Sequence, residues 1–142
     1  MSRFVLDTDT VVHLLRGHEK VCRRTINVLP EDSLAITIVT VEELLSGWYT
    51  QIRRARNDDQ ILRAYAALQQ TIEFVGGIFI WPFDELALSK FRELRGQKLR
   101  VGSNDLKIAA IILQIPDAVL VTSNYGDFEK VSGLTIEDWT RS

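Results

Sequence analysis

Short, nearly continuous apolar runs alternate with helical patterns along the chain, and this alternation constrains the fold more than any other feature. The runs cover residues 3–7, 34–40, 77–81 and 118–122, and a short fifth run lies at residues 134–136. Such runs are typical of strands that are covered on both faces. Because they alternate with helical segments, we expect an α/β fold, a three-layer α/β/α sandwich around a central, mainly parallel sheet of four or five strands.

Helical spacing of apolar residues fills the segments between these runs. We expect a short helix that stops near Gly17, a second over residues 20–28, and others over residues 85–95 and 106–113. Two longer patterns, over residues 41–52 and 61–72, predict a helical hairpin that is broken near residues 57–59. With 142 residues and no repeat or linker, the chain suits one domain over residues 1–142.

Composition excludes several classes of site. Cys22 is the only cysteine, which rules out an internal disulfide and a multi-cysteine metal site and fits a reducing cytoplasm. His13 and His18 are the only histidines, so a histidine-rich zinc site is not expected. No run of 18 apolar residues occurs, and the N-terminus lacks the apolar stretch of a signal peptide. We therefore expect a cytoplasmic protein with no membrane segment.

Four acidic residues lie where an expected element begins or ends, and they are Asp7, Glu43, Asp105 and Asp127. In an open α/β sheet, ligands bind outside the carboxyl ends of the strands. If these four positions share that edge, their carboxylates converge there and repel one another. Such a cluster implies a hard divalent cation, because cations such as Mg²⁺ prefer oxygen ligands. The sequence thus predicts a metal site made of these four acids.

Helix capping is the competing explanation for Asp7 and Asp105. After Asp7, Asp9 or Thr10 lies closer to the first apolar helical residue, so one of them is expected to be the cap. Asp105 heads the apolar face of its helix, and the Ser-Asn pair just before it offers caps of its own. A carboxylate in line with a buried face needs a partner. Capping therefore explains Asp7 and Asp105 poorly, and they are the preferred metal ligands.

Glu43 has a stronger capping explanation. Thr40 and Glu43 have the spacing of a capping box, in which Thr40 would be the N-cap of the helix. The two roles are compatible, since Glu43 points away from the apolar stripe and Gly47, one turn later, leaves that side bare for a ligand. Glu43 is therefore expected to act both as a cap and in the metal site.

The fourth acidic position is open between two residues. Thr122 ends the run at residues 118–122, and Asn124 and Asp127 follow it in a segment rich in turn-forming residues. Asn124 offers a neutral oxygen or a contact to water, and Asp127 offers a fourth carboxylate. Thr122 and Asn124 are therefore supporting candidates, and the spacing does not decide between Asn124 and Asp127.

Four motifs occur in a characteristic order, followed by a tail at residues 131–139. They are Leu6-Asp7-Thr8-Asp9, the T-x-x-E-L-x-x-G pattern at residues 40–47, the segment 102–110 around Asn104-Asp105, and Leu120-Val121-Thr122-Ser123-Asn124 followed by Asp127-Phe128. Together they resemble a PIN-domain protein of the VapC type, the toxin of a bacterial toxin–antitoxin pair. The resemblance covers almost the whole chain.

The resemblance implies a function as well as a fold. It implies a Mg²⁺- or Mn²⁺-dependent endoribonuclease that hydrolyses RNA phosphodiester bonds, with transfer RNA as a candidate substrate. It maps Asp7, Glu43 and Asp105, and Asp127 as the fourth acid, onto the family's catalytic and metal-binding acids. It also implies a cognate antitoxin and a homodimer. Family members often have Asn where Asp9 stands, so Asp9 is an extra carboxylate that either joins the metal site or caps the helix.

Basic residues are clustered although the net charge is −2. Lys98, Arg100 and Lys107 surround Asp105 in the sequence, and we expect them to bind RNA phosphates. A second cluster at residues 53–56 holds three arginines, which could serve RNA, the antitoxin or neither.

Two other functions fit parts of the sequence. Asp7-Thr8-Asp9-Thr10-Val11 after an apolar strand matches the D-x-D-x-[TV] motif of haloacid-dehalogenase-like phosphatases, in which Asp7 would be phosphorylated and Asp9 would be the acid/base. That function leaves Glu43 and Asp105 without a role. Alternatively, the chain is a non-catalytic PIN-like binding module whose acids hold a basic partner peptide.

Overall fold

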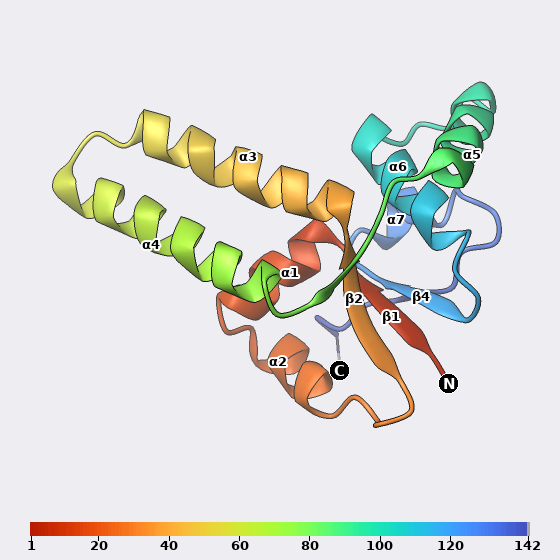
Figure 1. Cartoon of the computed structure of the whole chain (residues 1–142), viewed down its shortest axis with the longest axis horizontal. Coiled ribbons are helices and arrows are strands. Elements are labelled where there is room, and N and C mark those ends of the chain that lie inside the picture. Colours follow the sequence, from red (N-terminus) through yellow and green to blue (C-terminus); the bar gives the residue numbers. More distant parts are fainter. Residues whose placement is uncertain (142) are drawn as a thin grey trace.

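Five strands form one fully parallel sheet in the computed structural model, which describes residues 1–141 (Figure 1). The strands are β1 (Arg3–Leu6), β2 (Ser33–Thr37), β3 (Phe79–Trp81), β4 (Ala118–Val121) and β5 (Ile136–Glu137). Their order across the sheet is β3-β2-β1-β4-β5, so the first strand of the chain is the central one. The prediction of a mainly parallel sheet of four or five strands is confirmed.

Seven helices connect and cover these strands within the described residues. They are α1 (Thr8–Leu15), α2 (Glu19–Ile26), α3 (Ile38–Arg54), α4 (Asp58–Val75), α5 (Glu85–Gly96), α6 (Ser103–Ile112) and α7 (Tyr125–Phe128). Each predicted helical pattern corresponds to one of them. The break predicted near residues 57–59 is real, since Asn57 accepts a hydrogen bond from the backbone N–H of Gln60 at 2.8 Å and caps α4.

Alternate side chains of the central strands point to opposite faces of the sheet, and helices cover both faces. On one face, Val5 and Leu120 pack in a core with residues of α5 and α6. On the other, Leu6 and Val121 pack with residues of α1, α2 and α3. These two cores make the molecule a three-layer α/β/α sandwich, as the sequence predicts.

Helices α3 and α4 form the predicted hairpin, which extends well beyond the sheet (Figure 1). The indole N–H of Trp48 on α3 donates a hydrogen bond to the hydroxyl of Thr71 on α4 at 2.8 Å. Thr71 is fully buried, and its own hydroxyl donates to the carbonyl of Ala67. This polar link fixes how the two helices pack against each other.

The observed strands differ from the predicted runs by one to three residues at their ends, and the largest difference is at the end of β2. The run at residues 34–40 was expected to be strand throughout, yet β2 ends at Thr37 and α3 begins at Ile38. The hydroxyl of Thr37 accepts a hydrogen bond from the backbone N–H of Thr40 at 3.2 Å, so Thr37 is the N-cap of α3. β-Branched residues suit a strand, but this cap turns the last three residues of the run into the first turn of a helix.

No helix among the described residues is both long and apolar enough to span a lipid bilayer.

Candidate functional site

The candidate site lies where the direction of strand order reverses. From β1 the chain builds β2 and β3 on one side and then crosses to place β4 on the other side of β1. In an open parallel sheet, the crevice at such a switch point, outside the carboxyl ends of the strands, is where ligands bind. Asp7 follows β1 and Thr122 follows β4, so both lie at this crevice.

Asp7 is a buried carboxylate held by two donors. Its Oδ1 accepts a hydrogen bond from the backbone N–H of Thr10 at 2.8 Å, and its Oδ2 accepts one from the hydroxyl of Thr122. Burial raises the pKa of the Asp7 carboxyl, and these hydrogen bonds offset part of that effect. Asp7 is therefore the N-cap of α1, and the expectation that Asp9 or Thr10 would be the cap is wrong.

Glu43 lies in the second turn of α3 and receives two side-chain hydrogen bonds. The hydroxyl of Thr8 donates to its Oε1 at 2.6 Å, and the amide of Asn104 donates to its Oε2 at 3.4 Å. The predicted capping box is wrong, because α3 starts earlier than expected and Thr37, not Thr40, is its cap. With no capping role, Glu43 faces the crevice between the start of α1 and the start of α6.

Asp105 lies in the first turn of α6, where its pKa is affected by burial and by the neighbouring acids. Burial is the main reason that its pKa is raised from 3.8 to about 6. The second reason is repulsion from the other carboxylates, which are, in decreasing order, Glu43, Asp7, Asp127 and Asp9. Four acids from three distant parts of the sequence thus lie close enough to Asp105 to disfavour its charge.

The Ser-Asn pair before Asp105 does not cap α6, contrary to expectation. The N-cap is Gly102, which has no side-chain capping bond, and both Ser103 and Asn104 lie inside the first turn. Because Asn104 is one residue into the helix, its amide is directed across the crevice to Glu43 rather than back to the backbone.

Asn124 and Asp127 act together rather than as alternatives. The side-chain amide of Asn124 donates a hydrogen bond to Oδ2 of Asp127 at 3.1 Å. Asn124 thus orients the Asp127 carboxylate, which is one of the groups that raise the pKa of Asp105. Lys130 lies 3.7 Å from the other oxygen of Asp127 and partly offsets its charge. Asp9 is exposed, and its effect on Asp105 is the smallest of the four.

The donor set fits a divalent cation. Within residues 1–141, no basic side chain forms a salt bridge with Asp7, Glu43 or Asp105, so the negative charge of the crevice is not neutralised by the protein. A hard cation surrounded by carboxylate oxygens would neutralise it. As the side chains of these residues stand, no three His, Cys, Asp or Glu residues form a ready coordination group. Binding an ion would therefore require some of these side chains to move, or water to complete the coordination.

Two hydroxyl groups of the crevice were not predicted to contribute. Thr8 holds Glu43, and it also donates toward the hydroxyl of Thr40 at 3.1 Å. Thr10 is fully buried, and its hydroxyl donates to the carbonyl of Val121 at 3.0 Å, which ties α1 to the end of β4. The repetition of threonine on both sides of Asp9 was the available signal, since polar residues at the end of a buried strand need partners.

The three basic residues expected to bind RNA do not lie together. Lys98 and Arg100 are exposed in the loop between α5 and α6. Lys107 is two positions after Asp105 on α6, which places it roughly 200° around the helix, and its ammonium lies 5.5 Å from the centroid of the Phe91 ring on α5. Lys98 and Arg100 therefore stay candidates for RNA contact, whereas Lys107 faces α5.

A family model for the PIN domain matches residues 4–134 of the chain. The chain belongs to the PIN domain family. The resemblance inferred from the four motifs is therefore confirmed.

Curated relatives and a solved structure match this PIN domain over nearly its full length. "Ribonuclease VapC1" of Haemophilus influenzae (strain R2866) is 28% identical, with 97% of this chain and 98% of the relative covered. "tRNA(fMet)-specific endonuclease VapC" of Shigella flexneri is 28% identical, with 99% and 100% covered. The structure of VapBC-1 from nontypeable Haemophilus influenzae superposes with a TM-score of 0.73 at 26% identity, covering 98% of this chain and 99% of that one.

Proposed function

We propose that this PIN domain is a metal-dependent endoribonuclease that hydrolyses RNA phosphodiester bonds with Mg²⁺ or Mn²⁺. The observation that carries the proposal is the position of Glu43, which is hydrogen-bonded to Thr8 next to Asp7 and to Asn104 next to Asp105. Burial and the neighbouring acids also raise the pKa of Asp105 to about 6. Two relatives of similar length carry the names ribonuclease and endonuclease, which supports the same activity.

The acids have different roles in this proposal. Asp7 and Asp105 would ligate the ion directly. Asp7 is fixed by hydrogen bonds from the N–H of Thr10 and the hydroxyl of Thr122. Asp105 is repelled by the other four carboxylates, and a bound cation would relieve that repulsion. Glu43 and Asp127 would complete the site, directly or through water. When bound, the ion lowers the pKa of a coordinated water and offsets charge on the scissile phosphate.

The remaining contacts of the crevice would orient the reacting water. Glu43 is held on one oxygen by Thr8 and on the other by Asn104, so its carboxylate has a defined direction. A carboxylate in that position can accept a proton from the attacking water, provided that it lies within hydrogen-bond reach of the water. Asn104 and Thr8 are thus proposed as positioning residues.

The biological setting is also part of the proposal. We expect a toxin of a toxin–antitoxin pair, acting in the cytoplasm on an RNA such as transfer RNA, bound by a cognate antitoxin and assembled as a homodimer. Support comes from the relatives, since one is described as tRNA(fMet)-specific and the structurally similar protein is part of a VapBC assembly.

The structure gives less support to the phosphatase alternative than the sequence does. Asp9 would have to be its acid/base, yet Asp9 is exposed, whereas the buried Asp7 receives its hydrogen bonds from Thr10 and Thr122. A phosphatase of this kind would also leave the convergence of Glu43 and Asp127 on Asp105 unexplained.

Cleavage of RNA by the purified protein tests the proposal. Total bacterial RNA is incubated with the protein and Mg²⁺, or with EDTA, and the RNA ends are sequenced. We expect defined cleavage with Mg²⁺, none with EDTA, and none from Asp105→Asn. Cleavage that persists in Asp105→Asn would sink the proposal, and hydrolysis of a small phosphomonoester that is lost in Asp9→Asn would favour the phosphatase instead.

A further inference from the structure

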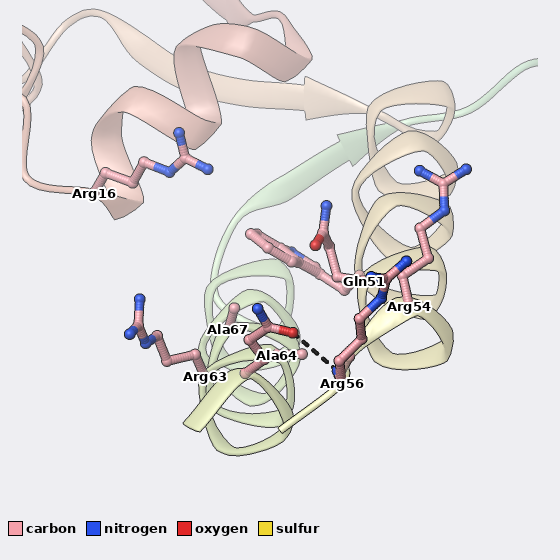
Figure 2. A pocket seen from close by; sticks show the side chains of 10 residues that line it. Arg16, Gln51, Arg54, Arg56, Arg63, Ala64 and Ala67 are labelled. Atoms are coloured by element: carbon pink, nitrogen blue, oxygen red, sulfur yellow. Dashed lines mark hydrogen bonds between the residues drawn. The ribbon is translucent and has the colours of Figure 1, made fainter. Parts of the chain in front are cut away.

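A pocket lined by arginines lies beside the helical hairpin, next to a smaller hollow that reaches Glu43 of the acidic crevice. It has a volume of about 780 Å³ and lies between the end of α1, the second half of α3 and the first half of α4 (Figure 2). Four arginines line it: Arg54 on α3, Arg63 on α4, Arg16 just after α1, and Arg56 in the loop between α3 and α4. Trp48 and Gln51 on α3 line the same pocket.

Most of this positive charge is uncompensated. Arg63 forms an ion pair with Asp59 one turn earlier on α4. In contrast, Arg16, Arg54 and Arg56 form no salt bridge with any residue among 1–141, and all three are exposed. Three guanidinium groups around one hollow form a site for an anion, because arginine donates paired hydrogen bonds to phosphate and carboxylate oxygens.

The pocket is continuous with the acidic crevice. A second, smaller hollow of about 200 Å³ is lined by Thr8, Glu43 and Gly47, and it shares Arg16, Trp48 and Gln51 with the arginine pocket. At Gly47, which lines the smaller hollow, an added Cβ atom would meet nothing within 4 Å, so this side of α3 is open. One groove therefore runs along α3 from Glu43 to Arg54.

The length of this groove suits a short piece of a nucleic-acid strand. Glu43 and Arg54 are eleven residues apart on one helix, which corresponds to about 16 Å at the rise of an α-helix. A stacked strand places one phosphate about every 3.4 Å, so the groove spans about five nucleotides. Trp48 lies midway along it, with its indole N–H satisfied by Thr71 and its side chain only half-buried.

We propose that Arg16, Arg54 and Arg56 bind the phosphates of single-stranded RNA that leads away from the cleavage site, with Trp48 offering a stacking surface for a base. A basic groove with an aromatic side chain is the arrangement that binds single strands without reading their sequence. The proposal rests on the proposed ribonuclease function, for which it names the path of the substrate.

An acidic peptide is the other ligand whose charge fits the arginines. Charge alone does not decide between the two ligands, because a cation at the proposed centre would attract a phosphate and a carboxylate alike. RNA is favoured by the middle of the groove, where Trp48 lies. The aromatic surface between the two ends serves a base, whereas an acidic side chain gains nothing from it.

Binding in the absence of cleavage tests this assignment. A labelled single-stranded RNA of about 12 nucleotides is titrated in EDTA, by fluorescence anisotropy at several salt concentrations, with the full-length protein. The double variant Arg54→Gln/Arg56→Gln is compared with the matched control Arg3→Gln/Arg53→Gln, which removes the same charge. Arg53 neighbours Arg54 on α3 but does not line the pocket, and Arg3 begins β1 at the end of that strand away from Asp7. Thermal unfolding verifies that both variants fold.

We expect Arg54→Gln/Arg56→Gln to bind this RNA about tenfold more weakly than the control, and to reduce the slope of log K against log salt by about 1.4, or 0.7 for each lost phosphate contact. Equal affinity and slope in the two double variants would overturn the proposal. So would a variant that binds RNA like the control but loses binding to decaglutamate, since the pocket would then serve an acidic peptide. Because the titration contains no metal, its outcome is independent of whether the protein cleaves RNA.

Discussion

The hydroxyl of Thr122, at the end of β4, donates a hydrogen bond to Oδ2 of Asp7, at the end of β1, across 115 residues of sequence. This contact joins the two strands at the switch point and fixes the buried carboxylate of the site. The backbone N–H of Asn124 donates to the same hydroxyl at 2.9 Å, so the segment that carries Asp127 is connected to it as well.

Thr122→Val should therefore destabilise the fold and impair the site. The valine keeps the volume but leaves the buried Asp7 carboxylate short of one donor, which costs about 1.5–3 kcal/mol of unfolding free energy. Chemical denaturation of the metal-free protein measures this loss. The control is Thr122→Ser, which keeps the hydroxyl. If the valine variant is as stable as the serine variant, the hydrogen bond does not have the weight assigned to it.

Asp105→Asn should stabilise the metal-free protein at neutral pH. A carboxyl with a raised pKa in the folded state favours folding below its ordinary pKa of 3.8 and opposes it once the pH exceeds about 6. Asp105 is half-exposed, so solvent screening reduces the cost at pH 7.5 to about 1 kcal/mol. The melting temperature of Asp105→Asn should exceed that of the wild type by about 3 °C at pH 7.5. The gap should close as the pH falls toward 4, and a gap that is constant with pH would contradict the explanation.

Asn104→Ala should lower RNA cleavage with little effect on stability. The Asn104 amide holds one oxygen of Glu43, and its loss lets the carboxylate adopt other directions. A misplaced group of this kind reduces the rate rather than abolishing it, by about tenfold. The neighbouring Ser103 is exposed and does not cap α6, so Ser103→Ala is the matched control for cleavage rate and melting temperature. Equal rates in the two variants would remove Asn104 from the site.

Thr71→Val should loosen the hairpin that forms one wall of the groove. Its hydroxyl accepts the indole N–H of Trp48, and losing that acceptor leaves a partly buried donor unpaired at a cost of about 1–2 kcal/mol. Thr50→Val is a close control, because the Thr50 hydroxyl also donates to the carbonyl four residues earlier but accepts nothing from Trp48. Urea denaturation should separate the two variants, and equal midpoints would argue against this link.

Much of the fold follows from the sequence because its strands are short apolar runs and its helices are regular patterns. The error at β2 shows the limit of this reasoning. Ile38, Val39 and Thr40 have the composition of a strand, and only the cap formed by Thr37 makes them helical. The order of the strands also needs the folded molecule, since nothing in the chain states that β4 pairs with β1.

The acidic positions were predictable from one rule about parallel sheets, but their partners were not. Asp7 is a helix cap and is also buried at the crevice, whereas capping and a site role had been weighed against each other. The contacts of Glu43 with Thr8 and Asn104 span 35 and 61 residues, distances over which local spacing carries no information. The helices α3 and α6 start a few residues earlier than expected. This difference changes which side chains cap a helix and which face the crevice.

Calorimetric titration of Mn²⁺ into the metal-free protein tests most directly whether these acids form a metal site. We predict saturable binding to the wild type, and binding at least about tenfold weaker for Asp105→Asn. Glu42→Gln is the control, since Glu42 is adjacent to Glu43 but exposed, and its affinity should match the wild type. A wild type that binds no Mn²⁺, or an Asp105→Asn variant that binds it as tightly, would contradict the metal centre.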